Sequence, residues 1–187
     1  MDPFDNLTPM KYGLLMADPP WSFDNYSVKG ERKNAKFHYE CMSIEDICAM
    51  PVGHLASKNC LLWLWATNPM LPQALVAMER WGFQFKTAGT WVKTTRHGKT
   101  AFGTGYVLRS ANEPFLIGTI GTVKCTRGVR SVVYGQIREH SRKPDEAYAA
   151  AEQLVPHVHR AELFSRQARQ GWEVWGNQSQ LFSERPE

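Results

Sequence analysis

The apolar residues of this chain gather in short blocks separated by polar stretches, and the blocks predict a series of strands. Short apolar runs bounded by turn-forming residues are typical of buried strands, and runs in which apolar and polar residues alternate are typical of half-buried strands. Such runs occupy residues 12–17, 60–66, 83–93, 113–121, 160–165 and 171–177. The pattern therefore predicts strands along the whole length of the chain.

Between these runs, three segments carry helical patterns. Residues 43–50 open with a serine three positions before an aspartate, which resembles a capping box. Apolar residues recur at helical spacing over residues 69–81. Residues 143–155 have Pro144 near their start and acidic residues in the first turn, where the helix dipole favours them.

Strands that alternate with helices predict an α/β domain with a largely parallel sheet and helices on both faces. The length of 187 residues suits a single domain, residues 1–187. In such sheets ligands bind at the carboxyl ends of the strands. Asp18 directly follows the first predicted strand and Asn177 the last, so both would face one crevice if the two strands are central and parallel.

Two polar, glycine-containing stretches, residues 24–40 and 94–111, are predicted to be long loops of the kind that carries function. Basic residues cluster in both, and the formal net charge of the chain is +4. This charge is compatible with a polyanionic partner, although solvated loop charges explain each cluster equally well. Phosphate contacts are expected from Arg32, Lys33, Lys36, Arg96 and Lys99.

The remaining composition narrows the cellular setting. Four cysteines show neither paired spacing nor a zinc-type arrangement with histidine, which favours a reducing compartment. The N-terminus lacks a basic-then-apolar signal, and no apolar run is long enough to cross a membrane. We therefore expect a cytoplasmic protein without a membrane anchor. The six histidines form no triad or metal-binding pattern, so no metal site is predicted.

The stretch Asp18-Pro19-Pro20-Trp21 is the strongest chemical signal, because it places a carboxylate at the end of a buried strand. A carboxylate and a rigid backbone carbonyl can accept the two N–H bonds of an exocyclic amino group and draw its nitrogen towards a reactive shape. Trp21 beside them offers a ring on which a base can stack. Catalysis would then rest on positioning and on charge stabilisation. The alternative is that Asp18 is a turn or helix-capping residue.

Four blocks now support a resemblance to a known family: "ADPPW" (17–21), "SRKPDEAY" (141–148), "RAELFSR" (160–166) and "GWEVWGNQ" (171–178). The sequence is similar to the adenine-N6 methyltransferases, the family of the eukaryotic messenger-RNA adenosine methyltransferase and of smaller bacterial and phage enzymes. The resemblance implies a Rossmann-like, S-adenosylmethionine-dependent methyltransferase fold. It also implies a permuted order in which the catalytic motif precedes the cofactor motif.

The same resemblance implies a set of cofactor-binding residues. Lys143 matches the lysine that approaches the methionine carboxylate of S-adenosylmethionine, and Asp18 is expected to lie beside the cofactor as well as at the catalytic motif. The adenosine and ribose positions match Glu162, Leu163, Phe164, Arg166, Asn177 and Gln178. A solvent-exposed lysine in a first helical turn and a strand-end asparagine are the plainer interpretations of Lys143 and Asn177.

For the substrate, Tyr39 matches an aromatic residue on a loop that covers the pocket, and Glu113 matches an acidic position at the junction of cofactor and substrate. The plainer interpretation of Tyr39 is an ordinary loop aromatic. Thr104, Tyr106 and Arg109, in the second long loop, are expected to meet the target base or its neighbours. A base buried in a duplex cannot reach a deep crevice, so base flipping or a single-stranded substrate is implied.

Several functions stay open at this point. Small members of the family imply DNA as the substrate, with RNA as the alternative. A catalytically silent nucleic-acid-binding subunit is the alternative from another class, although the intact DPPW and GNQ motifs argue against it. An amine of a small molecule or a protein glutamine is a further alternative, and Asp18 favours adenine over cytosine. A homodimer would widen the basic surface.

Overall fold

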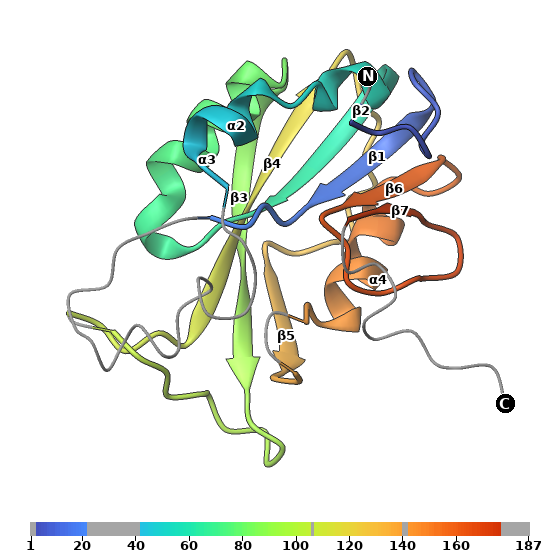
Figure 1. Cartoon of the computed structure of the whole chain (residues 1–187). Helices are drawn as coiled ribbons and strands as arrows, with labels where there is room; N and C mark the ends of the chain where they lie inside the picture. The colour runs from blue at the N-terminus through green and yellow to red at the C-terminus, as the bar shows by residue number, and fades with distance from the viewer. Residues whose placement is uncertain (1–2, 22–41, 106, 140–141, 177–187) are drawn as a thin grey trace, which may run out of the picture.

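The computed structural model describes residues 3–21, 42–105, 107–139 and 142–176, which form a seven-stranded sheet with helices on both faces (Figure 1). The strands are β1 (Tyr12–Ala17), β2 (Ala56–Trp65), β3 (Gln84–Thr94), β4 (Asn112–Ile120), β5 (Val132–Gln136), β6 (Arg160–Leu163) and β7 (Glu173–Trp175). The helices are α2 (Ile44–Ala49), α3 (Leu71–Arg80) and α4 (Asp145–Leu154), with short 3₁₀ turns at Val52–Leu55 and Asn68–Met70. Over these residues, no helix combines the length and the apolar character that a membrane crossing demands.

The sheet is mixed, with the strand order β5-β3-β4-β2-β1-β6-β7. The expected parallel arrangement holds for four of its pairings, whereas β4 is antiparallel to both β2 and β3. The chain passes from β3 to β4 without a crossover helix, and neighbouring strands joined in this way pair antiparallel. Because β4 is reversed, its first residues lie at the same edge of the sheet as the last residues of β1 and β2.

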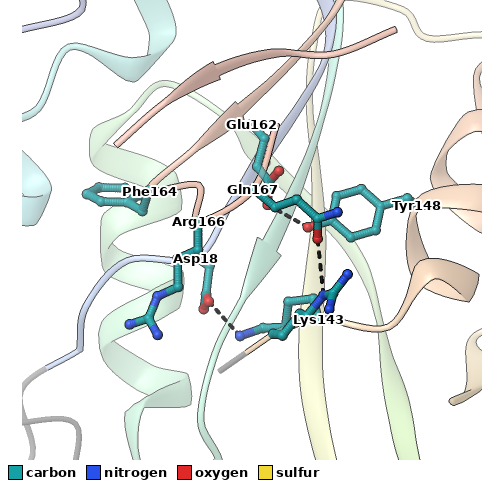
Figure 2. Close-up of a pocket in the computed structure, with 8 residues that line it drawn as sticks. Asp18, Lys143, Tyr148, Glu162, Phe164, Arg166 and Gln167 are labelled. Carbon is teal, nitrogen blue, oxygen red and sulfur yellow. Dashed lines mark hydrogen bonds and ion pairs between the residues drawn. The ribbon is translucent and has the colours of Figure 1, made fainter. Parts of the chain in front are cut away.

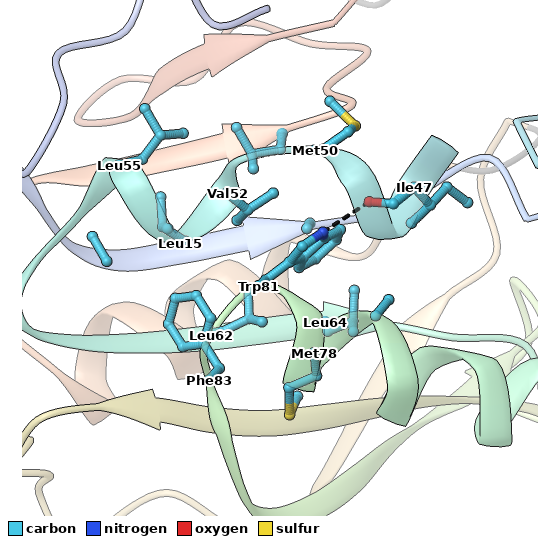
Figure 3. Packing of buried hydrophobic residues seen from close by; sticks show 14 of the residues in the cluster. Leu15, Ile47, Met50, Val52, Leu55, Leu62, Leu64, Met78, Trp81 and Phe83 are labelled. Carbon is cyan, nitrogen blue, oxygen red and sulfur yellow. Dashed lines mark hydrogen bonds between the residues drawn. The ribbon is translucent and has the colours of Figure 1, made fainter. Parts of the chain in front are cut away.

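Each face of the sheet carries its own apolar core. On one face, Leu15 and Ala17 of β1 pack with residues of α2 and α3, and on the other Leu14 and Met16 pack with α4. Burial on both faces explains why β1 is a continuous apolar run rather than an alternating one. Figure 3 shows the first core, where the Trp81 indole donates a 2.8 Å hydrogen bond to the carbonyl of Ile47 and thereby joins the ends of α3 and α2.

Two elements differ from expectation. The predicted strand at 171–177 forms β7, but β7 lies at the edge of the sheet rather than in its centre, next to β6. Asn177, which was expected to share a crevice with Asp18, lies outside the described residues. The strand β5 was not predicted at all, because it is a short edge strand in which only Val133 and Gly135 are buried.

Candidate active site

The candidate site lies at the carboxyl end of β1, where the first motif begins. Asp18 follows β1 directly, and its backbone N–H donates a 3.4 Å hydrogen bond to the carbonyl of Leu163 at the end of β6. A pocket opens beside this contact, and Figure 2 shows how side chains from three separate segments converge on it. Its lining comprises Asp18, Arg142, Lys143, Tyr148, Glu162, Phe164, Arg166 and Gln167.

The two prolines and Trp21 form a fixed turn. The N–H of Trp21 donates to the carbonyl of Pro19 at 2.8 Å, and the N–H of Met42 donates to the carbonyl of Pro20 at 3.2 Å. The Trp21 side chain is only 3% exposed, and its indole donates a 3.0 Å hydrogen bond to the carbonyl of Trp65. The expected role of Trp21 as a stacking surface for a base does not fit this burial, because its ring lies inside the core and anchors the turn instead.

A chain of alternating charges runs from the turn into the sheet. The Lys143 ammonium lies 2.5 Å from Asp18 Oδ2 and 3.0 Å from Glu113 Oε1, and Lys93 Nζ lies 2.8 Å from Glu113 Oε2. Lys143 is nearly buried, with a side chain 6% exposed, and its ammonium also lies 5.4 Å from the centre of the Trp65 ring. Glu113 reaches this place because β4 runs antiparallel, so that its first residues lie at the same edge of the sheet as the end of β1, with only β2 between the two strands.

These contacts shift the acidity of each group. Burial raises the pKa of the Glu113 carboxyl, but Lys143 and Lys93 outweigh that effect and hold it below its ordinary value. Burial lowers the pKa of Lys143, yet Asp18 and Glu113 raise it to a net value above the ordinary one. Burial also raises the pKa of Asp18, which Lys143 opposes and the Glu113 carboxylate reinforces, so Asp18 is a stronger base than an exposed aspartate.

On the other side of the pocket, a buried carboxyl is held by hydroxyl groups. The Tyr148 hydroxyl donates to Glu162 Oε1 at 2.6 Å, and the Ser165 hydroxyl donates to Glu162 Oε2 at 3.0 Å. Burial raises the pKa of Glu162 in spite of these hydrogen bonds. The Arg169 guanidinium packs over the Tyr148 ring, 3.8 Å from the ring centre, and helps to hold the ring in place.

The end of β6 turns sharply at this point. Phe164 has a left-handed backbone with φ of 63°, which is unusual for a residue with a side chain. This conformation places Phe164 at the pocket, edge-on to Trp175 with 5.4 Å between ring centres. Leu163, one residue earlier, is fully buried in the core, so its only route to a ligand is through the backbone.

The structure brings many of the predicted site residues together. Asp18, Lys143, Glu162, Phe164 and Arg166 line one pocket, and Glu113 joins them through Lys143. The predicted residues Lys33, Lys36, Tyr39, Tyr106, Asn177 and Gln178 lie outside the described residues.

Two predicted substrate residues lie on the segment between β3 and β4. Arg96 and Arg109 are both exposed there, Arg96 against His97 and Arg109 over the Phe102 ring. They are not part of the pocket lining.

Sequence reasoning assigned no site role to Lys93 or Tyr148. Lys93 is the penultimate residue of β3 and belongs to one of the basic clusters, and only the pairing of β3 with β4 shows that it contacts Glu113. A signal for Tyr148 existed in the sequence, because it lies on the apolar face of α4 between Ala147 and Ala151 and a buried tyrosine hydroxyl needs a partner. Arg142 and Gln167 also line the pocket unpredicted, joined by a 3.1 Å hydrogen bond.

The donor set suits an organic ligand that carries both signs of charge. Lys143 and Arg142 can hold a carboxylate, and Asp18 can accept from an amino group. The Glu162 carboxyl, with acceptor capacity beyond its two hydroxyl donors, suits a ligand hydroxyl. Across the described ranges, no group of three or more histidines, cysteines and carboxylates could hold a metal ion.

Comparison with known proteins adds an independent finding. The family model described as MT-A70 matches residues 12–178. The chain is 28% identical over 198 residues to the type II methyltransferase M.MunI of a Mycoplasma species, covering 94% of this chain and 83% of that protein.

Longer proteins match as well. The chain is 32% identical over 177 residues to a putative N(6)-adenosine-methyltransferase MT-A70-like protein of Medicago truncatula, covering 90% of this chain and 26% of that protein. It is 27% identical over 178 residues to the human N(6)-adenosine-methyltransferase catalytic subunit METTL3, covering 90% of this chain and 28% of METTL3. The chain thus spans most of M.MunI but little more than a quarter of these two proteins.

Proposed function

Because the chain belongs to the MT-A70 family of adenine-N6 methyltransferases, we propose that it transfers a methyl group from S-adenosylmethionine to the N6 amino group of adenine in DNA. One observation carries the proposal: the motif carboxylate Asp18, the buried Lys143 and the hydroxyl-held Glu162 line a single pocket. This arrangement supports a catalytic enzyme over a silent binding subunit, because a silent subunit has no need to keep a buried lysine between two carboxylates.

The charges and hydrogen-bonding groups of the pocket residues suit S-adenosylmethionine, and the cavity between them, about 20 Å³, has to widen for the cofactor to enter. Its amino-acid tail is zwitterionic, and Lys143 provides a cation for the carboxylate. Glu162, Phe164 and Arg166 would hold the adenosine, together with Asn177 and Gln178 from the segment that follows β7. When bound, the cofactor supplies a methyl group on a positively charged sulfonium, which is an activated leaving group.

The chain's own contribution is to hold the adenine amino group. Asp18 would accept one N–H, and its raised pKa makes it a stronger acceptor for the proton that the nitrogen sheds. The Pro19 carbonyl would accept the other, since its direction is fixed by the N–H of Trp21 and a carbonyl oxygen has a second lone pair. Lys143 would keep the Asp18 side chain in place.

DNA is favoured over RNA by the pattern of coverage. The type II methyltransferase M.MunI is matched over 83% of its length, so this chain has nearly the dimensions of that enzyme. The adenosine methyltransferases of Medicago truncatula and human are matched over only 26% and 28% of their length, so most of each of those proteins lies outside the match. RNA adenosine is the second candidate, because the similarity to those proteins covers 90% of this chain.

The remaining proposals concern architecture. We infer a single methyltransferase domain over residues 1–187 with a Rossmann-like fold and permuted motif order, supported by Asp18 after β1 and the cofactor set after β6. A homodimer would extend the basic surface around Arg96, Lys99 and Arg109. Sedimentation of the purified chain with and without DNA tests the dimer.

The test of the function is a methyl-transfer assay with labelled S-adenosylmethionine. Native DNA, heat-denatured DNA, RNA and a protein extract are offered in parallel, with Asp18→Asn as the control variant. We expect label in N6-methyladenine of DNA with the wild type only. Label in RNA alone would mean that the substrate is RNA rather than DNA, and label in protein would overturn the proposal. Calorimetric binding of S-adenosylmethionine without any transfer would support the silent subunit instead.

A further inference from the structure

The segment that joins β3 to β4 presents large apolar side chains to solvent beside the candidate site. Phe102 is 81% exposed, Val107 is 87% exposed and Leu108 is 83% exposed, which makes them among the most exposed apolar residues of the described chain. Three such residues within one short segment are unusual, because exposed apolar patches mark surfaces that contact a partner. We call residues 102–105 and 107–110 the finger.

The finger is a built structure rather than a loose connection. Gly103 N–H donates to the Ser110 carbonyl and Ser110 N–H to the Thr104 carbonyl, each at 2.9 Å. A side chain at Gly103 would meet the Ser110 carbonyl oxygen at 2.5 Å, and one at Gly105 would meet the Leu108 carbonyl oxygen at 1.9 Å. Glycine is therefore required for the two arms to approach so closely, and Val107 and Leu108 lie at the tip.

The segment that carries the finger is connected to the candidate site at its base. The residues that flank its segment, Lys93 at the end of β3 and Glu113 at the start of β4, form the 2.8 Å ion pair described above. Backbone hydrogen bonds tie the same end together, from Ala101 N–H to the Lys93 carbonyl and from Lys93 N–H to the Ala111 carbonyl. Glu113 in turn contacts Lys143, so the base of the finger lies two ion pairs away from Asp18.

The charge around the finger selects the class of partner. Residues 95–111 contain Arg96, Lys99 and Arg109 and no acidic residue. All three basic residues are exposed, and the Arg109 guanidinium lies 5.4 Å from the centre of the Phe102 ring. Apolar side chains surrounded by cations suit a partner that has a polyanionic backbone and a stacked apolar interior, which is the chemistry of a nucleic-acid duplex.

We propose that the finger inserts Val107 and Leu108 between the bases of a DNA duplex, where they fill the space that the target adenine leaves when it rotates into the pocket. The inference rests on the proposed function and adds that the substrate is double-stranded. Removing a base from a stack has a substantial energetic cost, and an apolar side chain in the gap offsets part of it. Single-stranded DNA has no such gap, so the finger tip would contribute little there.

The test compares a tip variant on two forms of the same DNA. Val107→Ser with Leu108→Ser removes the apolar tip from exposed positions, so folding is not at risk. Adenine-unmethylated genomic DNA, made by amplification, is offered native and heat-denatured, and N6-methyladenine is measured after digestion. We expect about a tenfold loss on native DNA and less than about a twofold loss on denatured DNA. Met10→Ser is the matched control, because Met10 is 77% exposed and precedes β1 at the end opposite Asp18.

Each result that contradicts the expectation has its own meaning, so failure of the insertion can be distinguished from failure of the proposed function. An equal loss on both forms of DNA, or no loss on either, would overturn the insertion. A drop in oligomeric mass of the tip variant, seen by light scattering without DNA, would assign the finger to a contact between two copies of the chain instead. Failure of the wild type to methylate either form of DNA would count against the proposed function itself.

A second readout follows insertion without measuring methylation. Once the methylated adenines are mapped, 2-aminopurine replaces the target adenine in a duplex oligonucleotide, where its fluorescence increases on unstacking. Adding the wild-type enzyme should increase the fluorescence, and the tip variant should give a clearly smaller increase at saturating protein. An equal increase would show that the adenine leaves the stack without the finger.

Discussion

Two carboxyl groups at the candidate site, Glu162 in the pocket lining and Glu113 behind Lys143, are held in opposite ways. Glu113 lies between the ammonium groups of Lys93 and Lys143, and its pKa is held below the ordinary value despite burial. Glu162 lies between the hydroxyls of Tyr148 and Ser165, and burial raises its pKa. One side of the pocket is therefore built from full charges and the other from neutral hydrogen bonds.

The difference matches what each side would have to do. A base that must accept a proton needs a defined charge state, and the chain of Lys93, Glu113 and Lys143 fixes the charge around Asp18. The sugar of a cofactor carries uncharged hydroxyl groups, which need hydrogen-bond acceptors. A carboxyl group that accepts from two protein hydroxyls can provide such acceptors, and its burial costs less free energy than that of an unpaired carboxylate. If this division is correct, the same kind of substitution should have different consequences on the two sides.

The largest effect is expected from Asp18→Asn, which removes charge from the first side alone. Activity should fall by about a hundredfold to a thousandfold, because a preorganised carboxylate at the reacting group is lost. The affinity for S-adenosylmethionine, measured by calorimetry, should change by less than about threefold, since Glu162 and Phe164 are untouched. A large loss of affinity would place Asp18 on the cofactor side and break the division.

The second effect is expected from Glu113→Gln. Two ammonium groups lose their shared carboxylate, so stability at pH 7 should fall by about 2 kcal/mol. Activity should also shift in pH. Glu113 raises the pKa of Asp18, so its neutral replacement lowers that pKa, and the acid limb of the kcat/KM profile should move to lower pH. An acid limb that stays in place would show that Glu113 does not act on Asp18.

Much of the fold was predictable because burial leaves a direct mark on the sequence. β1 and β2 are covered on both faces and read as continuous apolar runs, and the cap of α2 formed as expected, with Ser43 Oγ accepting from the N–H of Asp46 at 3.0 Å. β5 left no such mark, since its exposed positions Val132 and Tyr134 dilute the pattern.

The candidate site was predictable in its members more than in its connections. Asp18, Lys143 and Glu113 were each chosen from local motifs. Their ion pairs, however, depend on the reversed direction of β4, which brings Glu113 to the same edge of the sheet as the end of β1. No local pattern contains the direction of a strand. Lys93 was missed for the same reason, because its partner Glu113 is a neighbour only across the β3–β4 ladder.

A smaller effect is expected from Tyr148→Phe on the second side. Loss of one buried hydrogen bond to Glu162 should lower stability by about 1 kcal/mol. The hydroxyl lowers the pKa of Glu162, so without it the carboxyl binds its proton more tightly, and the deficit should grow as pH rises from 4 to 7. Urea unfolding measures this deficit, with Tyr134→Phe as the exposed control. A deficit that is constant with pH would mean that Glu162 does not depend on Tyr148.

The smallest effect is expected from Glu162→Gln, the counterpart of Glu113→Gln on the other side. A glutamine can accept from one hydroxyl and donate to the other, so stability at pH 7 should change by less than about 1 kcal/mol.

The dependence of stability on pH should change with opposite signs in Glu113→Gln and Glu162→Gln. A carboxyl with a lowered pKa adds stability that is lost as pH falls below about 4.5, so Glu113→Gln removes a rise of stability with pH. A carboxyl with a raised pKa loses stability as pH rises above about 4.5, so Glu162→Gln removes a fall. Urea unfolding of both variants between pH 3 and 7 distinguishes these slopes, and slopes that change in the same direction would mean that the two sides of the pocket do not differ in charge.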